Sequence, residues 1–132
     1  MAHNKYSLTP GTVIAVWVGF IRHVGIVTDR TYGAHPSVIS NSHRAGGVIE
    51  EPLPVFSSGQ HVDVAGYPGR LSPQQVLRRA RSRIGEAWDL PNWNCEHFVR
   101  WAHGLRPRSP QLVAGVILMC VFTVLLIADR RK

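Results

Sequence analysis

The sequence predicts an α+β fold, in which a small antiparallel sheet packs against helices and a transmembrane helix follows at the C-terminus. The first half of the chain contains short β-branched segments separated by turn residues, and the hydrophobic period becomes helical after Ser72. Residues 112–128 are almost wholly apolar. At 132 residues the chain has room for one domain, which we place at 1–104, before a linker at 105–111, the apolar segment and a basic tail at 129–132.

Strands are predicted where β-branched and apolar residues stand between turn-forming residues. These segments are residues 12–19, 21–28, 37–42, 47–51 and 61–65. Residues 29–36 are rich in turn formers and are predicted as a loop, and residues 53–56 as a short helical turn. The strands follow one another closely, which predicts an antiparallel meander.

Two helices are predicted after the strands. The first begins at Ser72 as N-cap with Pro73 at the first helical position, and it ends at Gly85. Its arginines are predicted to form a solvated face; they are Arg78, Arg79, Arg81 and Arg83. The second helix begins after Asn94, a favourable N-cap, and stops near Gly104.

The apolar segment at residues 112–128 has the length of a short membrane span, which needs about 17–25 residues. A buried core helix is the alternative, but a core helix of so small a domain would carry a polar stripe, and this segment has none. Basic residues flank it on both sides, which leaves its orientation open. A free thiol at Cys95 fits a reducing compartment, so we expect the domain on the cytoplasmic side.

The charge balance, 15 Lys+Arg against 8 Asp+Glu, gives a net charge of +7 and points to an anionic partner. No set of base-stacking aromatics accompanies the basic residues, so a membrane surface is expected and nucleic acid is not. Residues 1–6 are polar and predict no secretory signal. Because Cys120 lies inside the apolar segment, a disulfide with Cys95 is not expected.

Cys95 opens the second predicted helix, among unpaired backbone N–H groups at the positive end of the helix dipole. Both features are expected to lower the thiol pKa from about 8.5. His23, in the predicted strand at 21–28, could serve as the base. A cysteine nucleophile and a histidine base are the minimal apparatus for attack on a carbonyl group, and a third polar group usually orients the ring.

The remaining histidines and the tryptophans are given structural roles. His97, two positions after Cys95, is predicted to point away from it and to serve in packing or hydrogen bonding. His3, His61 and His103 are predicted to lie at the surface. Core or site-wall positions are predicted for Trp17, Trp88, Trp93 and Trp101.

Residues 94–99 (NCEHFV) resemble the signature of the lecithin–retinol acyltransferase-like family, and residues 23–27 (HVGIV) resemble its histidine-x-Gly-Ile strand motif. The resemblance is collinear over residues 12–104. It implies a circularly permuted papain-like fold and acyl transfer or hydrolysis on phospholipid esters. Cys95 would be the nucleophile that carries the acyl thioester, His23 the base, and the Cys95 backbone N–H an oxyanion donor. The C-terminal apolar segment agrees with the membrane span of the related small phospholipase/acyltransferases.

Many members of that family carry a second histidine in a Val-x-His sequence, where this chain has residues 38–40 (VIS). We therefore assign the orienting position to Ser40, with Asn41 and His43 as nearby alternatives. His35 is closer to the spacing of members with a shorter hairpin, but it is predicted to lie in the loop before the strand. A serine orients an imidazole less firmly than a histidine or a carboxylate does.

These features predict a membrane-anchored, cysteine-dependent acyltransferase or hydrolase whose partners are a lipid or acyl substrate and a membrane. A peptidase or amidase of the same superfamily is one alternative. The other is a weakly catalytic module that binds membranes, which the serine at position 40 favours. No cofactor is expected, and no metal, because no His/Cys/Asp/Glu cluster has ligand spacing. The acyl donor, the acceptor and the oligomeric state stay open.

Overall fold

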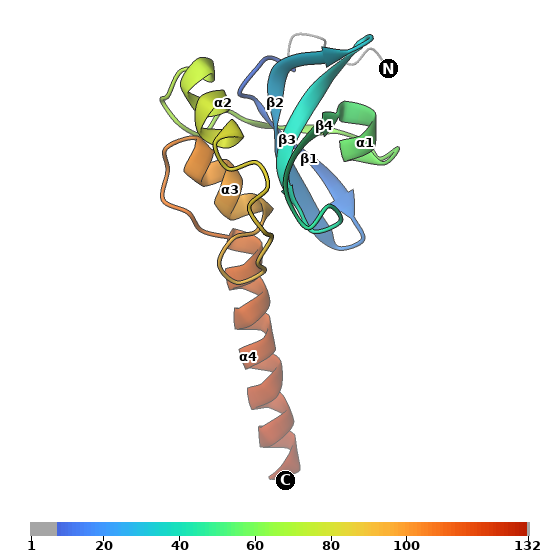
Figure 1. Ribbon diagram of the computed structural model, residues 1–132. Coiled ribbons are helices and arrows are strands. Elements are labelled where there is room, and N and C mark those ends of the chain that lie inside the picture. The colour runs from blue at the N-terminus through green and yellow to red at the C-terminus, as the bar shows by residue number, and fades with distance from the viewer. Residues whose placement is uncertain (1–7, 132) are drawn as a thin grey trace.

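The structure, a computed structural model, describes residues 8–131. Within this range five strands form one antiparallel sheet in the order β4-β3-β2-β1-β5 (Figure 1). The strands are β1 (Val13–Val18), β2 (Ile21–Tyr32), β3 (His35–Ser42), β4 (Gly47–Pro52) and β5 (Asp63–Gly66). The predicted sheet is confirmed, with each strand near its expected place. The predictions for residues 1–6, including the absence of a secretory signal and the surface position of His3, lie outside the described residues.

The predicted loop at residues 29–36 is wrong, because most of it is strand. β2 continues to Tyr32 and β3 begins at His35, and these two residues pair across a turn at Gly33, which has a φ of +57°. The side chains of residues 29–35 are exposed, so this part of the hairpin has the polar composition of a loop and no hydrophobic alternation. Cross-strand pairing, which composition does not show, extends the ladder.

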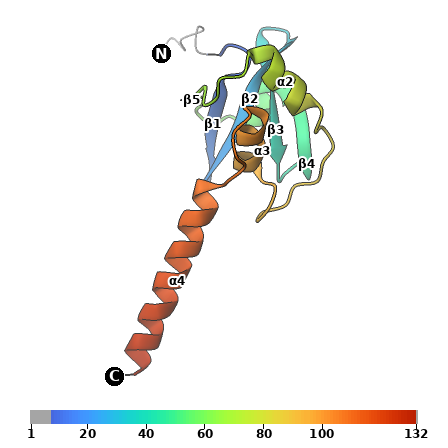
Figure 2. The ribbon, with the colours of Figure 1, turned by 90° about the vertical axis from the view of Figure 1, so that its left-hand side faces the viewer.

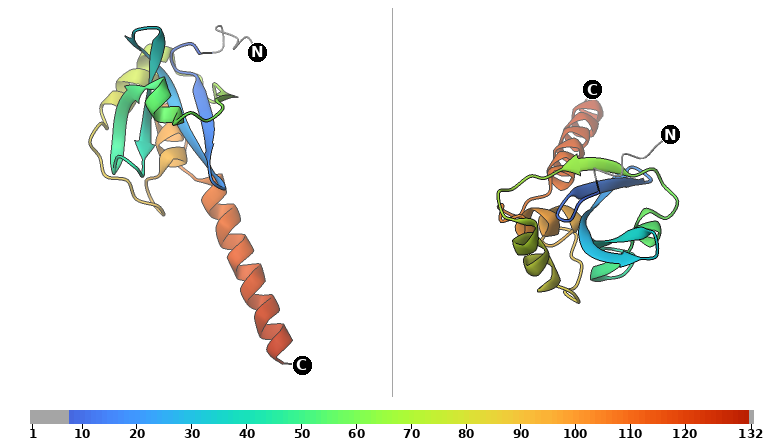
Figure 3. Two further views of the ribbon diagram at one scale, coloured as in Figure 1. Left: turned by 90° about the vertical axis from the view of Figure 1, so that its right-hand side faces the viewer. Right: turned by 90° about the horizontal axis from the view of Figure 1, so that it is seen from above.

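The described helices are α1 (Leu53–Ser57), α2 (Pro73–Arg81), α3 (Cys95–Ala102) and α4 (Pro110–Arg130). Helices α2 and α3 lie on one face of the sheet and α1 on the other, as the view from above also shows (Figures 1 and 3). Both caps predicted from the sequence are present: Ser72 accepts a hydrogen bond from the backbone N–H of Gln75, and Asn94 caps α3. Helix α2 ends at Arg81, and turns continue the chain to Gly85.

Side chains along each strand point alternately to the two faces of the sheet, so the core is divided into two clusters, one on each face. The cluster under α2 and α3 includes Val24, Ile26, Ile39, Phe98 and Cys95. The cluster under α1 consists of Ile14, Val16, Val27, Val38 and Phe56. Successive residues of β2 therefore contribute to opposite faces, which decides below where the two candidate catalytic side chains lie.

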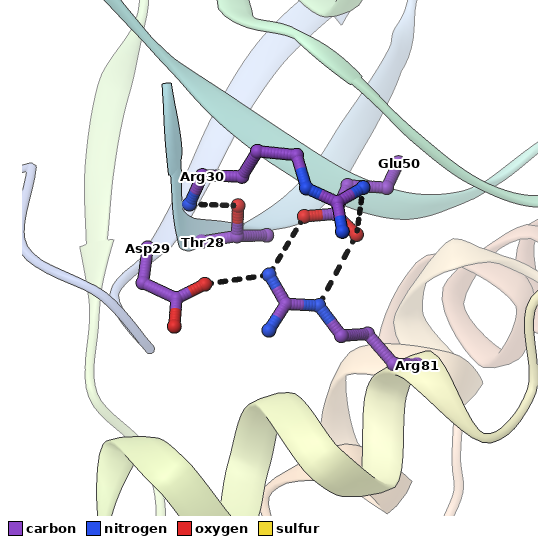
Figure 4. A network of polar contacts seen from close by, with 5 residues as sticks. All are labelled: Thr28, Asp29, Arg30, Glu50 and Arg81. Atoms are coloured by element: carbon purple, nitrogen blue, oxygen red, sulfur yellow. Dashed lines mark hydrogen bonds and ion pairs between the residues drawn. The ribbon is translucent and has the colours of Figure 1, made fainter.

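The predicted solvated arginine face of α2 is wrong for three of its four members. Arg79 lies 4.3 Å over the Trp101 ring and donates hydrogen bonds to the Trp101 carbonyl, and Arg83 lies 4.4 Å over the same ring. Arg81 binds Asp29 and Glu50 of the sheet (Figure 4). Only Arg78 of this set is exposed to solvent. Helix α2 thus uses its basic residues to attach to α3 and to the sheet.

The Arg81 contacts are short and join a helix to two strands. The Arg81 Nη2 donates to Asp29 Oδ1 at 2.6 Å and to Glu50 Oε1 at 2.9 Å, while Nε donates to Glu50 Oε2 at 3.2 Å (Figure 4). Burial alone would raise the pKa of Glu50, but hydrogen bonds from Arg81 and Thr28 outweigh it and hold that pKa below its ordinary value. The ionised carboxylate therefore stabilises the fold.

Replacing Arg81 with glutamine should lower the free energy of unfolding by about 1–3 kcal/mol, because the largely buried Glu50 carboxylate loses its main partner. Arg78→Gln, on the same helix but exposed and without a hydrogen bond or ion pair in the structure, should change it by less than about 0.5 kcal/mol. Denaturant unfolding of the detergent-solubilised protein checks both values.

The Arg81 effect should depend on pH in a definite direction. Because the folded-state pKa of Glu50 is lowered, its contribution is present above the unfolded value of about 4.3 and is lost as pH falls through the folded-state pKa. The gap between wild type and Arg81→Gln should therefore narrow below about pH 4. A gap that stays constant or widens on acidification would contradict this assignment.

Helix α4 projects from the domain as one long rod (Figure 2). It is long and apolar enough to cross a membrane by length and composition, and none of its most hydrophobic window is buried. The buried core helix weighed as an alternative is therefore wrong. The helix starts at Pro110, with the Ser109 hydroxyl accepting from the Leu112 N–H, and so includes residues just outside the predicted span of 112–128. Its one hydroxyl side chain, Thr123, donates to the Met119 carbonyl within the helix.

Candidate active site

A pocket of about 560 Å³ lies where the beginning of β2, the beginning of α3 and the first turns of α4 meet. Both Cys95 and His23 line it. Residues more than seventy positions apart in the sequence are thus brought to one cavity, because the antiparallel sheet places the beginning of β2 beside the N-terminus of α3. The side chains of Trp88 and His43 also line the pocket, and their rings are in contact, with centroids 4.4 Å apart and planes tilted by 56°.

The N-terminus of α3 is held by reciprocal capping hydrogen bonds. The Asn94 side-chain oxygen accepts from the N–H groups of Glu96 and His97 at 3.0 and 3.3 Å, and His97 Nδ1 accepts from the Asn94 N–H at 3.1 Å. His97 therefore serves in hydrogen bonding, as predicted. These hydrogen bonds fix the backbone that carries Cys95. The Cys95 sulfur takes no part in them.

The Cys95 sulfur lies beside the backbone on both sides of His23. It is 4.0 Å from the Arg22 carbonyl oxygen, and the Val24 N–H points toward it. Strand β1 pairs with this part of β2 along one edge, and the pairing of β2 with β3 ends at Ile26. The sulfur therefore lies at the open edge of β2, level with His23.

The two candidate side chains approach the pocket from different faces of β2. The His23 ring packs against Phe56, with ring centroids 4.9 Å apart, whereas Cys95 belongs to the cluster under α3. Between these two described residues the structure has no hydrogen bond from the Cys95 sulfur to either ring nitrogen of His23. The structure therefore brings the two candidate side chains to one pocket without a direct bond between them, an arrangement that occurs in unliganded sites.

Burial sets the charge state of both groups. Burial raises the pKa of the Cys95 thiol and outweighs the hydrogen bond from the Val24 N–H, so the predicted lowering by the helix N-terminus is wrong. Burial, with a smaller effect from the Arg44 charge, lowers the pKa of His23 to about 4. At neutral pH the site therefore holds a neutral thiol and a neutral imidazole, and not a thiolate–imidazolium pair.

The four candidates for the residue that orients the His23 ring lie in different places in the structure. Ser40 is fully buried and its hydroxyl has no partner. Extending the Ile26–Ile39 register places Ser40 opposite Gly25, on the same face as His23 and diagonal to it. Ser40 thus lies on the sheet face that carries the His23 ring, without a hydrogen bond to it.

The three alternatives lie elsewhere. Asn41 points to the opposite face, where its side-chain N–H donates to the Trp93 carbonyl at 2.7 Å and its oxygen stays buried without a partner. His43 is exposed and lines the pocket against Trp88. His35 is exposed at the hairpin turn, about 30 Å along the strands from His23, and the structure does not bring it to the pocket.

Gln111, which the sequence did not single out, connects α4 to the site. Its side-chain amide exchanges two hydrogen bonds with the backbone of Arg22, whose N–H donates to Oε1 at 2.8 Å and whose carbonyl accepts from Nε2 at 2.7 Å. We call this contact the Gln111 amide pair. Glu96 adds a second connection, because its carboxylate accepts from the Ser109 hydroxyl and from the Gln111 backbone N–H. The only sequence signal was a polar residue at the edge of an apolar run.

Two other predictions about aromatic residues are wrong. His103 is buried, its Nε2 is 2.9 Å from the Gly11 carbonyl oxygen, and its ring meets Tyr67 edge-on. Trp17 is 53% exposed, at the end of β1. Predicted placements hold for the other tryptophans and for His61: Trp88 lines the pocket, Trp93 and Trp101 pack against the core, and His61 is exposed near Asp63. Within residues 8–131 there is no group of three His, Cys, Asp or Glu side chains that could hold a metal ion.

A cysteine at a helix N-terminus and a histidine on the adjoining strand, opening into one pocket of an α+β domain, define the class of thiol-dependent acyl-transfer and hydrolytic proteins. The family model described as lecithin retinol acyltransferase matches residues 7–105, and the chain belongs to this family. The resemblance drawn from residues 94–99 is thereby confirmed. Membership indicates thiol-dependent acyltransferase or hydrolase chemistry. A comparison with curated proteins gives no match.

Proposed function

We propose that the protein is a membrane-anchored thiol enzyme that transfers or hydrolyses the acyl group of lipid esters through an acyl thioester on Cys95. The observation that carries this proposal is the opening of Cys95 and His23 into one pocket at the end of the domain from which α4 leaves. A substrate carried by the bilayer would meet the thiol there, at a high local concentration.

The chemistry begins with both groups neutral. The Cys95 sulfur forms a bond to the ester carbonyl carbon, its proton passes to a ring nitrogen of His23, and the carbonyl oxygen takes the negative charge. The backbone N–H of Cys95, at the start of α3, donates to that oxygen. When the carbon–oxygen bond to the alcohol breaks, His23 returns the proton to the leaving oxygen. Water or an acceptor alcohol or amine then gives its proton to His23, attacks the thioester and releases the thiol.

Proton transfer requires His23 to approach the sulfur. The sulfur lies at the open edge of β2, level with His23, so rotation about the Cα–Cβ bond of His23 moves the ring from Phe56 toward it. Ser40 is buried on the sheet face that His23 occupies, and its hydroxyl has no partner, so it does not hold the ring by a hydrogen bond in the observed position. We therefore assign Ser40 an indirect role and reserve proton transfer for His23.

The end of the domain that faces α4 also carries an exposed apolar tip. The hairpin between β1 and β2 exposes four large apolar side chains, those of Trp17, Val18, Phe20 and Ile21. This tip lies at the end of the domain from which α4 leaves, level with the start of that helix (Figures 1 and 2). A membrane crossed by α4 would therefore meet the hairpin tip, which supports a substrate taken from the bilayer.

The test is covalent capture of the acyl group. The full-length protein is reconstituted into phosphatidylcholine vesicles, and the Cys95 peptide is examined by mass spectrometry for an acyl adduct that neutral hydroxylamine removes. The adduct should also form in Cys120→Ala, which lacks the other cysteine and keeps the pocket wall apolar. Absence of the adduct from Cys95, or turnover of peptide amides without turnover of lipid esters, would overturn the proposal.

Phe20→Asp should reduce the rate on phospholipid in vesicles about tenfold and leave the rate on a water-soluble short-chain ester within about twofold. Phe20 is 99% exposed in the hairpin tip, so a carboxylate there costs little in the domain but opposes contact with the bilayer. The matched control is Tyr32→Asp, an exposed aromatic residue at the other end of β2. Equal losses on both substrates, or equal losses in both variants, would contradict this role for the tip.

A further inference from the structure

The pocket continues from Cys95 along one face of α4. Its lining there consists of Leu112, Gly115, Val116, Met119 and Cys120. These positions recur at intervals of three and four residues, so they lie on a single stripe of the helix. The stripe extends for about 12 Å along the axis, at 1.5 Å per residue. One wall of the cavity is thus the first half of the helix proposed as the anchor.

The position of this wall is fixed relative to the thiol. The Gln111 amide pair joins α4 to Arg22, the same residue whose carbonyl oxygen lies 4.0 Å from the Cys95 sulfur. Glu96, which follows Cys95, accepts from Ser109 and from the Gln111 backbone. Two side chains therefore connect the first turn of α4 directly to the residues around the sulfur, so the stripe cannot swing away without breaking these bonds.

The polarity of the cavity changes along its length. Beside Cys95 lie the polar side chains of Asn94, Glu96 and Gln111, while the remainder of the α4 wall is apolar, and Ile21 and Leu90 add further apolar lining. Gly115 lies within the stripe, and a Cβ built there would meet no atom within 4 Å. The missing side chain leaves open space at the middle of the wall.

We infer that this groove is an acyl-chain binding site, with the ester carbonyl at Cys95 and the chain lying along the α4 stripe past Gly115. The inference rests on the proposed function for the identity of the ligand, but the groove itself is a property of α4 and β2. A flexible, unbranched apolar chain with one polar end matches a cavity that is apolar along the α4 stripe and has polar side chains beside the thiol. Helix α4 is thus a wall of the substrate site as well as an anchor.

The inference is tested by filling the groove at Gly115. Gly115→Leu places a side chain into the cavity, and Ala114→Leu places the same side chain on the opposite face of the helix, outside the pocket. Leucine is a better helix former than glycine and only slightly poorer than alanine, so both variants should keep α4 helical. Far-UV circular dichroism and thermal unfolding in detergent confirm that both variants are folded.

The readout is the rate at which Cys95 is alkylated by N-hexadecyl iodoacetamide relative to N-ethyl iodoacetamide, resolved by mass spectrometry of the Cys95 peptide. We expect Gly115→Leu to lower this ratio about tenfold and Ala114→Leu to leave it unchanged. An unchanged ratio in Gly115→Leu, or an equal fall in both variants, would overturn the inference. Alkylation needs only an accessible thiol, so a fall confined to Gly115→Leu would support the groove even if no phospholipid adduct formed and the proposed function failed.

Discussion

Cys95→Ala is expected to reduce the turnover of phospholipid esters by at least about 10³-fold, because no acyl-enzyme can form without the sulfur. The side chain is buried in the cluster under α3, and alanine preserves most of its volume, so the fold should survive. The measurement is release of lysolipid from vesicles into which the full-length protein has been reconstituted, with unfolding in detergent as the check on stability.

The matched control for that experiment is Cys120→Ala, which removes the other cysteine of the chain. Cys120 is the last residue of the α4 stripe in the pocket lining, where alanine keeps the wall apolar, and no bond of the proposed reaction forms or breaks at its sulfur. Its replacement should leave turnover within about threefold. Turnover that persisted in Cys95→Ala would remove the covalent mechanism and favour a module that binds membranes without chemistry.

His23→Gln is expected to lower kcat/KM by about 10²–10⁴-fold, the usual contribution of a positioned general base. The pH profile gives a sharper test. Because the pKa of His23 is lowered to about 4, the wild-type imidazole is protonated only below that pH and can accept the thiol proton above it. kcat/KM of the wild type should therefore rise with pH through about 4, since this constant reports the free enzyme.

The pH profile of His23→Gln tests whether His23 causes the rise of kcat/KM near pH 4. His23→Gln should show no rise near pH 4, because glutamine does not titrate. A wild-type limb near pH 6.5 would indicate that the ring is not held in the buried position against Phe56. A limb that persists in the variant would assign the titration to another group and would contradict the role of His23.

Local signals in the sequence predicted those parts of the fold that short-range chemistry determines. The capping residues Ser72 and Asn94 placed the beginnings of α2 and α3, because a side-chain oxygen that accepts from the first turn acts within three residues. The strands with buried faces were found from their apolar residues. The β2–β3 hairpin was missed at its exposed end, where cross-strand pairing and not hydrophobic alternation holds the residues in strands.

The candidate site could be predicted as a pair of residues but not as an electrostatic environment. The motifs at Cys95 and His23 indicated which side chains meet, and the structure brings them to one pocket. Their pKa shifts depend on burial by segments distant in the sequence, so the helix-terminus argument for Cys95 gave the wrong sign. Gln111 was missed for the same reason, since its partner is the backbone of Arg22, eighty-nine positions away.

The Gln111 amide pair has a consequence for how the protein would work in a cell. A domain joined to its anchor by a flexible linker samples many orientations and can reach neighbouring membranes, whereas this domain is joined by a side chain that pairs with strand β2 like an additional strand. If α4 crosses a bilayer, the mouth of the groove keeps a constant tilt and depth. The enzyme would then act in cis, on lipids of the leaflet in which it resides, and vesicles supplied from outside would be poor substrates.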